Sequence, residues 1–142
     1  MIKQRGKVAW TGDIKGHGTI STQSGVVEAP YSVGSRFEGQ KGTNPEELIG
    51  AAHAGCYTMY LTSVLTQAGH QVEGITTTSL VTMDPSVQPP LVTSIQVSTE
   101  GRVTGLSPAE FQAFAEDAKA NCPISRALSA VPEMTLEAKL AG

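Results

Sequence analysis

A long segment without charged side chains places the strongest constraint on how this chain can fold. From Leu48 to Val72 the sequence contains no Asp, Glu, Lys or Arg, and a segment of this length could cross a membrane. Polar side chains interrupt it throughout and dilute its apolar content; they include His53, Thr58, Thr62, Ser63, Thr66, Gln67 and His70. We therefore expect a buried helix of a water-soluble domain rather than a lipid-spanning helix.

The residues that precede this segment favour the start of a helix. Asn44 is a good N-cap, and Pro45 suits the first helical position. Glu46 and Glu47 place negative charge at the positive end of the helix dipole, and Glu47 has the spacing of a capping-box partner of Asn44. Together with Gly69, which is expected to end the helix, these signals predict a helix over residues 45–67.

Apolar residues occupy most faces of the expected helix. One stripe contains Leu48, Ala52, Cys56, Met59 and Ser63, and the other faces carry Ile49, Tyr57, Tyr60, Leu61, Val64 and Leu65. A helix that is apolar on most sides is buried on most sides. Because 142 residues offer limited material to surround it, we expect a second copy of the chain to pack against this helix in a homodimer.

Extended segments are expected on both sides of this helix because of their alternation or their β-branched residues. They are residues 7–10, 18–22, 26–29, 31–37, 74–84, 91–99 and 134–140. The loop Asp84–Pro90, which contains three prolines, joins the extended segments 74–84 and 91–99. This connection suggests that the two segments form an antiparallel pair.

Two shorter helices complete the pattern. Ser107 and Glu110 form a capping box with a proline between them, which predicts a helix to about Ala120, and a short helix is expected from Pro123 to Leu128. The order of strands, helix, strands, helix and strand indicates an α+β fold. No linker divides the chain, so residues 1–142 are expected to form a single domain.

Composition excludes several classes of protein. Ten Lys and Arg against 13 Asp and Glu give a formal charge of −3, which argues against a strongly basic nucleic-acid-binding protein. Two cysteines are too few for a disulfide framework, and with three scattered histidines they make a poor zinc site. No phosphate loop or nucleotide fingerprint is present, so no cofactor is expected. Without a visible targeting signal, we expect the protein in the cytoplasm.

The two cysteines are the best candidates for chemistry. Cys56 lies mid-helix among apolar residues, where a cysteine is most often a buried, inert hydrophobe, and it would need a nearby cation to become reactive. Cys122 lies at a helix start before Pro123, where backbone amides favour a thiolate. The two could meet where their helices pack, although the residues alone leave this open.

Four segments are distinctive in sequence. They are Ser35–Gly39 (SRFEG), Gly42–Ile49 (GTNPEELI), Ala52–Cys56 (AHAGC) and Lys119–Ser125 (KANCPIS). Together they resemble the OsmC/Ohr family of osmotically inducible and organic hydroperoxide resistance proteins, and the resemblance covers essentially the whole chain. The position of Arg36 shortly before the Asn-Pro-Glu-Glu segment resembles the OsmC branch.

This resemblance implies a thiol peroxidase for organic hydroperoxides and, more weakly, hydrogen peroxide. It implies that Cys56 is the peroxidatic cysteine, Cys122 the resolving cysteine, Arg36 the activating cation and Glu46 the carboxylate that holds this cation. The implied fold is an intertwined α+β homodimer with two active sites at the subunit interface. An external dithiol would reduce the disulfide, and oxidative or osmotic stress would be its setting.

The spacing of these residues adds one geometric expectation. Glu46 and Cys56 are about 15 Å apart along a straight helix, so one Arg36 cannot easily touch both within a subunit. We therefore expect either that Arg36 and Glu46 reach Cys56 of the partner subunit or that the helix breaks. His53 lies near Cys56 on the helix and could tune its thiol, although a core histidine with satisfied hydrogen bonds is more common.

Two other classes of function remain open from the sequence. One is a non-enzymatic module that binds an apolar ligand in an interface cavity. The other is a redox sensor in which a disulfide between Cys56 and Cys122 changes a partner contact. No DNA-reading helix is recognisable, which weakens the sensor hypothesis. In the peroxidase hypothesis, the candidates for an apolar surrounding that suits an alkyl hydroperoxide are Leu48, Met59, Tyr60 and Phe111.

Overall fold

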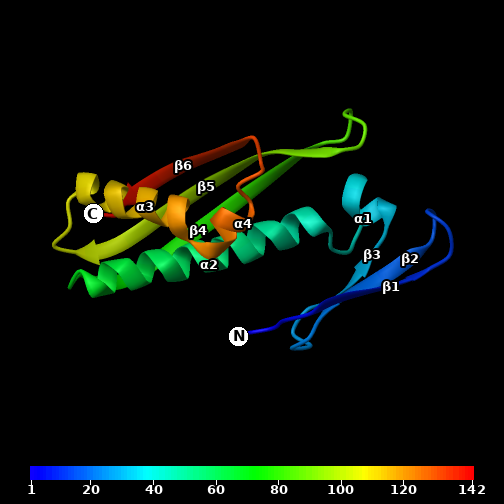
Figure 1. Cartoon of the computed structure of the whole chain (residues 1–142), viewed down its shortest axis with the longest axis horizontal. Coiled ribbons are helices and arrows are strands. Elements are labelled where there is room, and N and C mark those ends of the chain that lie inside the picture. Colours follow the sequence, from blue (N-terminus) through cyan, green and yellow to red (C-terminus); the bar gives the residue numbers. More distant parts are fainter. The chain divides into compact units, whose positions relative to one another are not determined.

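A computed structural model describes all 142 residues, which form the two compact units Met1–Leu48 and Ile49–Gly142 (Figure 1). The elements are β1 (Gly6–Thr11), β2 (His17–Thr22), β3 (Glu28–Tyr31), α1 (Val33–Phe37), α2 (Pro45–Gln67), β4 (Gln71–Asp84), β5 (Leu91–Thr104), α3 (Pro108–Asn121), α4 (Pro123–Ala127) and β6 (Glu133–Leu140). This mixture of helices with two separate sheets is an α+β fold, as predicted.

The first unit is a three-stranded antiparallel sheet followed by α1. Its strands lie in the order β1-β2-β3, and Trp10 of β1 packs edge-on against Tyr31 of β3, with ring centroids 5.9 Å apart. The expectation that residues 31–37 are extended is wrong beyond Tyr31. Ser32 and Ser35 form a reciprocal capping box, which begins helix α1 at Val33.

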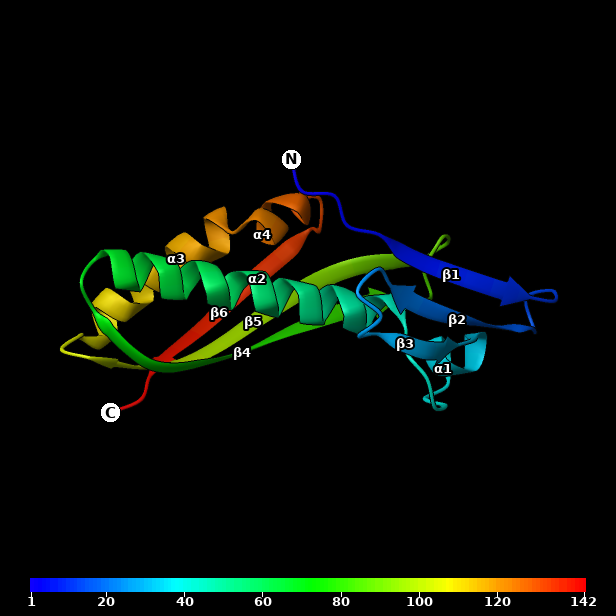
Figure 2. The same ribbon diagram turned by 90° about the horizontal axis from the view of Figure 1, so that it is seen from below.

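The second unit is built on the sheet β4-β5-β6. Strands β4 and β5 are antiparallel, as predicted, and β6 pairs in parallel with β5. One face of β5 is buried at every second residue: Ile95, Val97, Thr99, Gly101 and Val103. Helices α2, α3 and α4 lie over this face of the sheet (Figure 2).

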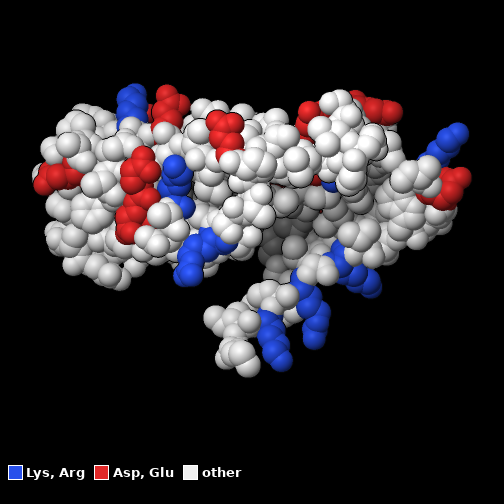
Figure 3. Space-filling model, turned by 45° about the horizontal axis from the view of Figure 1, so that its top comes forward, with Lys and Arg blue, Asp and Glu red and all other residues white.

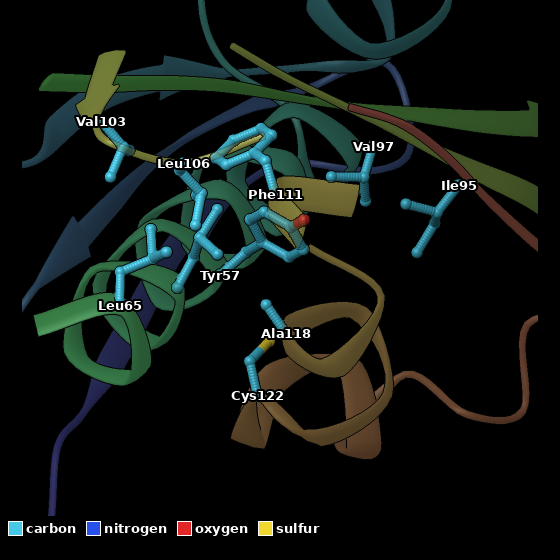
Figure 4. Packing of buried hydrophobic residues seen from close by; sticks show 10 residues of the cluster. Tyr57, Leu65, Ile95, Val97, Val103, Leu106, Phe111, Ala118 and Cys122 are labelled. Atoms are coloured by element: carbon cyan, nitrogen blue, oxygen red, sulfur yellow. The ribbon is translucent and has the colours of Figure 1, made fainter. Parts of the chain in front are cut away.

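The helices pack closely on the sheet where glycines allow it. A Cβ atom at Gly50 of α2 would lie 2.7 Å from the Ser79 carbonyl oxygen of β4, and one at Gly101 of β5 would lie 2.7 Å from the Phe111 ring of α3. Both approaches are closer than a side chain at either position would permit. The main core of buried side chains lies between these layers (Figure 4).

Helix α2 has the predicted bounds, but within a single chain only one face of the helix is buried. Its buried side chains recur every four residues: His53, Tyr57, Leu61 and Leu65. Of the predicted stripe, Ala52, Met59 and Ser63 are exposed, and Met59 has 76% of its surface accessible. In the single chain the sheet covers only one side of this helix, and burial of its other sides by a second copy stays a prediction.

The cap of α2 follows the prediction in part. The Asn44 side chain accepts a hydrogen bond from the backbone N–H of Glu47, with a length of 2.8 Å. The Glu47 carboxylate instead accepts a hydrogen bond from the Thr43 hydroxyl, at 3.2 Å. No helix of the structure, α2 included, combines the length and apolar character that a membrane crossing requires.

We predict that Leu65→Ala lowers the free energy of unfolding by about 2–5 kcal/mol, because it leaves a cavity under a fully buried side chain. Urea unfolding at fixed protein concentration measures this change. The adjacent Thr66→Ala is the matched control, since Thr66 is exposed and its loss should change stability by less than about 0.5 kcal/mol. Equal effects of the two substitutions would contradict the observed orientation of α2.

Candidate active site

Cys56 and Cys122 come together where α2 meets the corner between α3 and α4. Cys56 lies midway along α2, half-buried at the edge of the buried face. Cys122 is fully buried and both ends α3 and begins α4, because Pro123 cannot continue the preceding helix. Its sulfur points toward the core cluster (Figure 4). Both residues are free thiols in the structure.

The surroundings of Cys56 favour the neutral thiol. Burial raises the pKa of Cys56, and the neighbouring Cys122 side chain raises it further, whereas a hydrogen bond from the Ile124 backbone N–H acts in the opposite direction. None of the groups that shift this pKa is a cation. A reactive Cys56 therefore requires a positive charge beyond these groups.

A guanidinium and a carboxylate form a two-point ion pair in the first unit. Arg36 Nη2 donates to Glu46 Oε1 at 2.6 Å, and Arg36 Nε donates to Glu46 Oε2 at 3.2 Å. The pair is part-buried, with the Glu46 side chain 13% exposed. The hydrogen bond to Glu46 raises the pKa of Arg36, with a smaller contribution from Tyr31. The carboxylate therefore fixes both the charge and the orientation of the guanidinium.

Local sequence explains how this ion pair forms. The capping box of Ser32 and Ser35 begins α1, which carries Arg36 in its last turn. Arg36 therefore lies on a helix, whereas the sequence predicted a strand. The buried Ser35 hydroxyl also donates to the Thr43 carbonyl at 2.8 Å, tying α1 to the segment that leads into α2. Glu46 lies in the first turn of α2.

Helix α2 is unbroken from Pro45 to Gln67. The expectation that it breaks between Glu46 and Cys56 is therefore wrong. Their separation of ten positions corresponds to about 15 Å along the axis of a continuous helix. The supply of Arg36 by a partner subunit stays a prediction.

His53 lies inside the second unit and has two hydrogen-bond partners. Its Nδ1 is 2.8 Å from the Ser79 hydroxyl of β4, and its Nε2 is 2.7 Å from the Ser125 hydroxyl of α4. Burial lowers the pKa of His53, so the neutral imidazole is favoured. The Ser125 hydroxyl also lies 3.0 Å from Cys122 Sγ. The sequence interpretation missed Ser79 and Ser125, because nothing local marks a serine that meets a histidine far along the chain.

The predicted apolar lining residues have different surroundings. Phe111 is a core residue with 1% exposure and packs on Gly101, so it belongs to the interior of the unit. Tyr60 is partly buried against the core, and Met59 is exposed in a shallow groove on α2. That groove is otherwise lined by small or short side chains: Ala54, Gly55, Thr58, Thr62, Ser63 and Thr77.

On the face shown in Figure 3, acidic and basic side chains lie next to one another on the left of the view, whereas only basic side chains are seen along the lower edge. No group of three or more His, Cys, Asp or Glu side chains is arranged to hold a metal ion.

Comparison with known proteins gives consistent relatives. Residues 38–137 match the family model described as OsmC-like protein. The chain is 45% identical over 141 residues to "Peroxiredoxin OsmC" of Escherichia coli (strain K12), covering 98% of this chain and 97% of that protein. It is 29% identical over 126 residues to "Organic hydroperoxide resistance protein-like 1" of Staphylococcus saprophyticus, covering 85% and 84% of the two chains.

Solved structures share the fold. An OsmC-like protein of unknown function from Vibrio cholerae superposes with a TM-score of 0.75 at 18% identity, covering 97% of this chain and 99% of that one. The organic hydroperoxide resistance protein OhrB of Bacillus subtilis superposes with a TM-score of 0.64 at 24% identity, covering 96% and 98%.

We predict that mild oxidation with diamide joins Cys56 to Cys122 within one chain, because their side chains already interact. Mass spectrometry of the proteolysed protein should identify the linked peptides, and non-reducing electrophoresis should show a single chain. Cys122→Ser is the control and should form no internal link. Oxidation that yields only chain-to-chain disulfides would contradict the observed packing of the two thiols.

Proposed function

The chain belongs to the OsmC-like protein family, and on this premise we propose that it is a thiol-dependent peroxidase that reduces organic hydroperoxides and, more weakly, hydrogen peroxide. The observation that carries the proposal is the meeting of two free thiols, one half-buried and one fully buried, at one corner of the second unit.

The first step is oxidation of Cys56. Its thiolate attacks the terminal oxygen of the hydroperoxide, the O–O bond breaks, and the alkoxide leaves and takes a proton to become the alcohol. Cys56 is left as a sulfenic acid. Cys56 is only half-buried, so the single chain does not enclose this residue on all sides.

The second step joins the two sulfurs. Cys122 attacks the Cys56 sulfenic acid, the S–S bond forms, and the hydroxyl leaves with the thiol proton as water. An external dithiol then reduces the disulfide by thiol–disulfide exchange and returns both thiols. This cycle needs a reducing compartment, and we place the protein in the cytoplasm on that ground.

Arg36 is proposed to supply the positive charge that ionises Cys56. A guanidinium stays charged when partly desolvated, and Glu46 holds this one by two hydrogen bonds. Along a continuous α2, Glu46 and Cys56 of one chain are about 15 Å apart, which favours delivery of Arg36 to Cys56 of a partner subunit.

A homodimer is proposed because it would bring Arg36 to Cys56 of the partner and because one face of α2 is left uncovered. The face of α2 that carries Met59 and its small neighbours is exposed in the single chain. Small side chains allow a second helix to approach closely, and burial of Met59 would add apolar contact. A second copy packing on this face would enclose the half-buried Cys56 and create an interface active site.

We predict that the reduced protein, supplied with a dithiol, consumes cumene hydroperoxide faster than hydrogen peroxide. The reason is that the surroundings of Cys56 are mostly apolar and suit an alkyl group. Peroxide loss measured over many turnovers checks this, and Cys56→Ser should abolish it.

The outcomes of this assay separate the alternatives. Consumption that survives Cys56→Ser would remove the peroxidase proposal, and absence of consumption by the wild type would favour binding of an apolar ligand. One oxidation per chain without turnover, with any dithiol present, would favour a redox sensor. A clear preference for hydrogen peroxide would contradict the proposed selectivity.

We predict that two inactive variants restore each other when mixed as subunits. In a heterodimer of Arg36→Gln and Cys56→Ser chains, one of the two sites combines an intact Arg36 from one chain with an intact Cys56 from the other. Random pairing makes about half of the dimers mixed, so about a quarter of wild-type peroxide consumption should return.

Each variant carried alone through the same unfolding and refolding is the control and should stay inactive. If Arg36 acts within its own chain, no site in the mixed dimer is complete and the mixture stays inactive, which would contradict delivery across the interface.

A further inference from the structure

A chain of hydrogen bonds leads from the sulfur of Cys122 to a buried histidine. Cys122 Sγ lies 3.0 Å from the Ser125 hydroxyl, which lies 2.7 Å from His53 Nε2, and His53 Nδ1 lies 2.8 Å from the Ser79 hydroxyl. The Ser125 backbone N–H also donates to Cys122 Sγ, at 3.3 Å. The peroxidase cycle as described above uses neither His53 nor Ser125.

One arrangement of hydrogens satisfies the whole chain. The Cys122 S–H donates to Ser125 Oγ, the Ser125 O–H donates to His53 Nε2, and His53 Nδ1–H donates to the Ser79 hydroxyl. The direction follows from the Cys122 S–H at one end, and the Ser79 hydroxyl, which can donate or accept, takes the acceptor role at the other. In this arrangement the free lone pair of the imidazole, on Nε2, faces the thiol through Ser125. His53 Nε2 can thus accept the proton of the Cys122 thiol by way of Ser125.

Burial isolates these hydrogen-bonded side chains from solvent. His53 and Cys122 have no exposed surface, and Ser125 is 4% exposed. Burial also lowers the pKa of His53, which keeps the imidazole neutral and able to accept a proton near neutral pH. Water at neutral pH is a weak base with little access to the Cys122 proton, whereas Ser125 contacts the thiol and His53 contacts Ser125.

Few other titratable groups act at this place. On α2 they are Cys56, Tyr57 and Tyr60, and on α3 Glu116 and Asp117 act on the two tyrosines. Burial raises the pKa of both tyrosines, so they stay neutral near neutral pH. The residue that β4 presents is Ser79, and Arg126 of α4 is exposed. His53 is thus the base best placed to serve Cys122.

We infer that His53, acting through Ser125, accepts the proton of Cys122 as this thiol attacks the oxidised Cys56. The inference rests on the proposed function, because it assigns residues to the resolving step of that cycle. Ser125 touches the reacting sulfur, and His53 is a positioning residue that acts through it. The hydrogen bond between His53 and Ser79 of β4 holds the imidazole in place.

The proton and atom balance of the step is complete. As the Cys122 sulfur attacks the Cys56 sulfenic sulfur, its proton moves to Ser125 Oγ while the Ser125 proton moves to His53 Nε2. The S–S bond forms as the S–O bond breaks, and the departing hydroxide takes the proton back from the imidazolium by the same path. The products are the disulfide, neutral His53 and one water molecule.

The test isolates closure of the disulfide from peroxide chemistry. Cys56 of the full chain is converted to its mixed disulfide with 5-thio-2-nitrobenzoate, and attack by Cys122 releases the coloured thiolate. We expect His53→Gln to close at least about ten-fold more slowly than wild type at pH 7, because Gln can hold the Ser125 hydrogen bond but cannot accept a proton. The deficit should shrink as pH rises, since hydroxide can then take the thiol proton instead.

Serine variants supply the second arm. Ser125→Ala should close as slowly as His53→Gln, and Ser125→Thr should recover most of the rate because it restores the hydroxyl. Thr99→Val is the matched control, since Thr99 is a buried hydroxyl that bonds Thr77 and lies outside the chain of hydrogen bonds. This control should lose stability and keep the wild-type rate and pH profile of closure.

The outcomes either support or overturn the inference. Wild-type closure in His53→Gln overturns it, and so does a deficit of the same size at every pH, which indicates a structural role. Failure of wild type itself to close overturns it too. These results stand apart from failure of the proposed function, which appears as absence of peroxide consumption while closure remains fast.

Discussion

The packing of α2 on one face of the β4-β5-β6 sheet determines where both thiols lie. Every fourth residue of the helix faces the sheet and α3, as Tyr57 and Leu61 do, which leaves Cys56 at the border of the buried face. The close approach at Gly50 lets His53 reach β4. Within the single chain, Cys56 is therefore covered by the interior on one side and open on the other.

The same packing creates an electrostatic difficulty. A sulfur partly removed from water prefers to stay protonated, and the thiol of Cys122 beside it adds to this preference. We propose that the Arg36–Glu46 pair supplies the missing positive charge, because the carboxylate orients the guanidinium before any substrate arrives. Its two hydrogen bonds confine the cation to one geometry, which a lysine with a flexible stem would not achieve.

Local signals in the sequence predicted the elements, and distant contacts escaped it. Caps and prolines give the bounds of α2 and α3, because those interactions lie within one turn. The helix at Val33–Phe37 was missed because its capping box is a pair of serines in an otherwise strand-like segment. Cys56 and Cys122 stood out as the chain's only cysteines, and Arg36 and Glu46 by family resemblance. The partners of His53 lie 26 and 72 positions away, and only the packed fold brings them together.

In the proposed cycle both sulfurs lose a proton, and the difference in their burial explains why we propose a cation for Cys56 and a neutral base for Cys122. Cys56 is half-exposed, so a cation can approach it while keeping part of its own hydration. Cys122 has no exposed surface, and a cation placed beside it would lose its hydration at a cost that one thiolate cannot repay. A neutral base reached through a hydroxyl avoids that cost, since charge appears only while the sulfur attacks. The depth of each thiol thus selects the chemistry that can activate it.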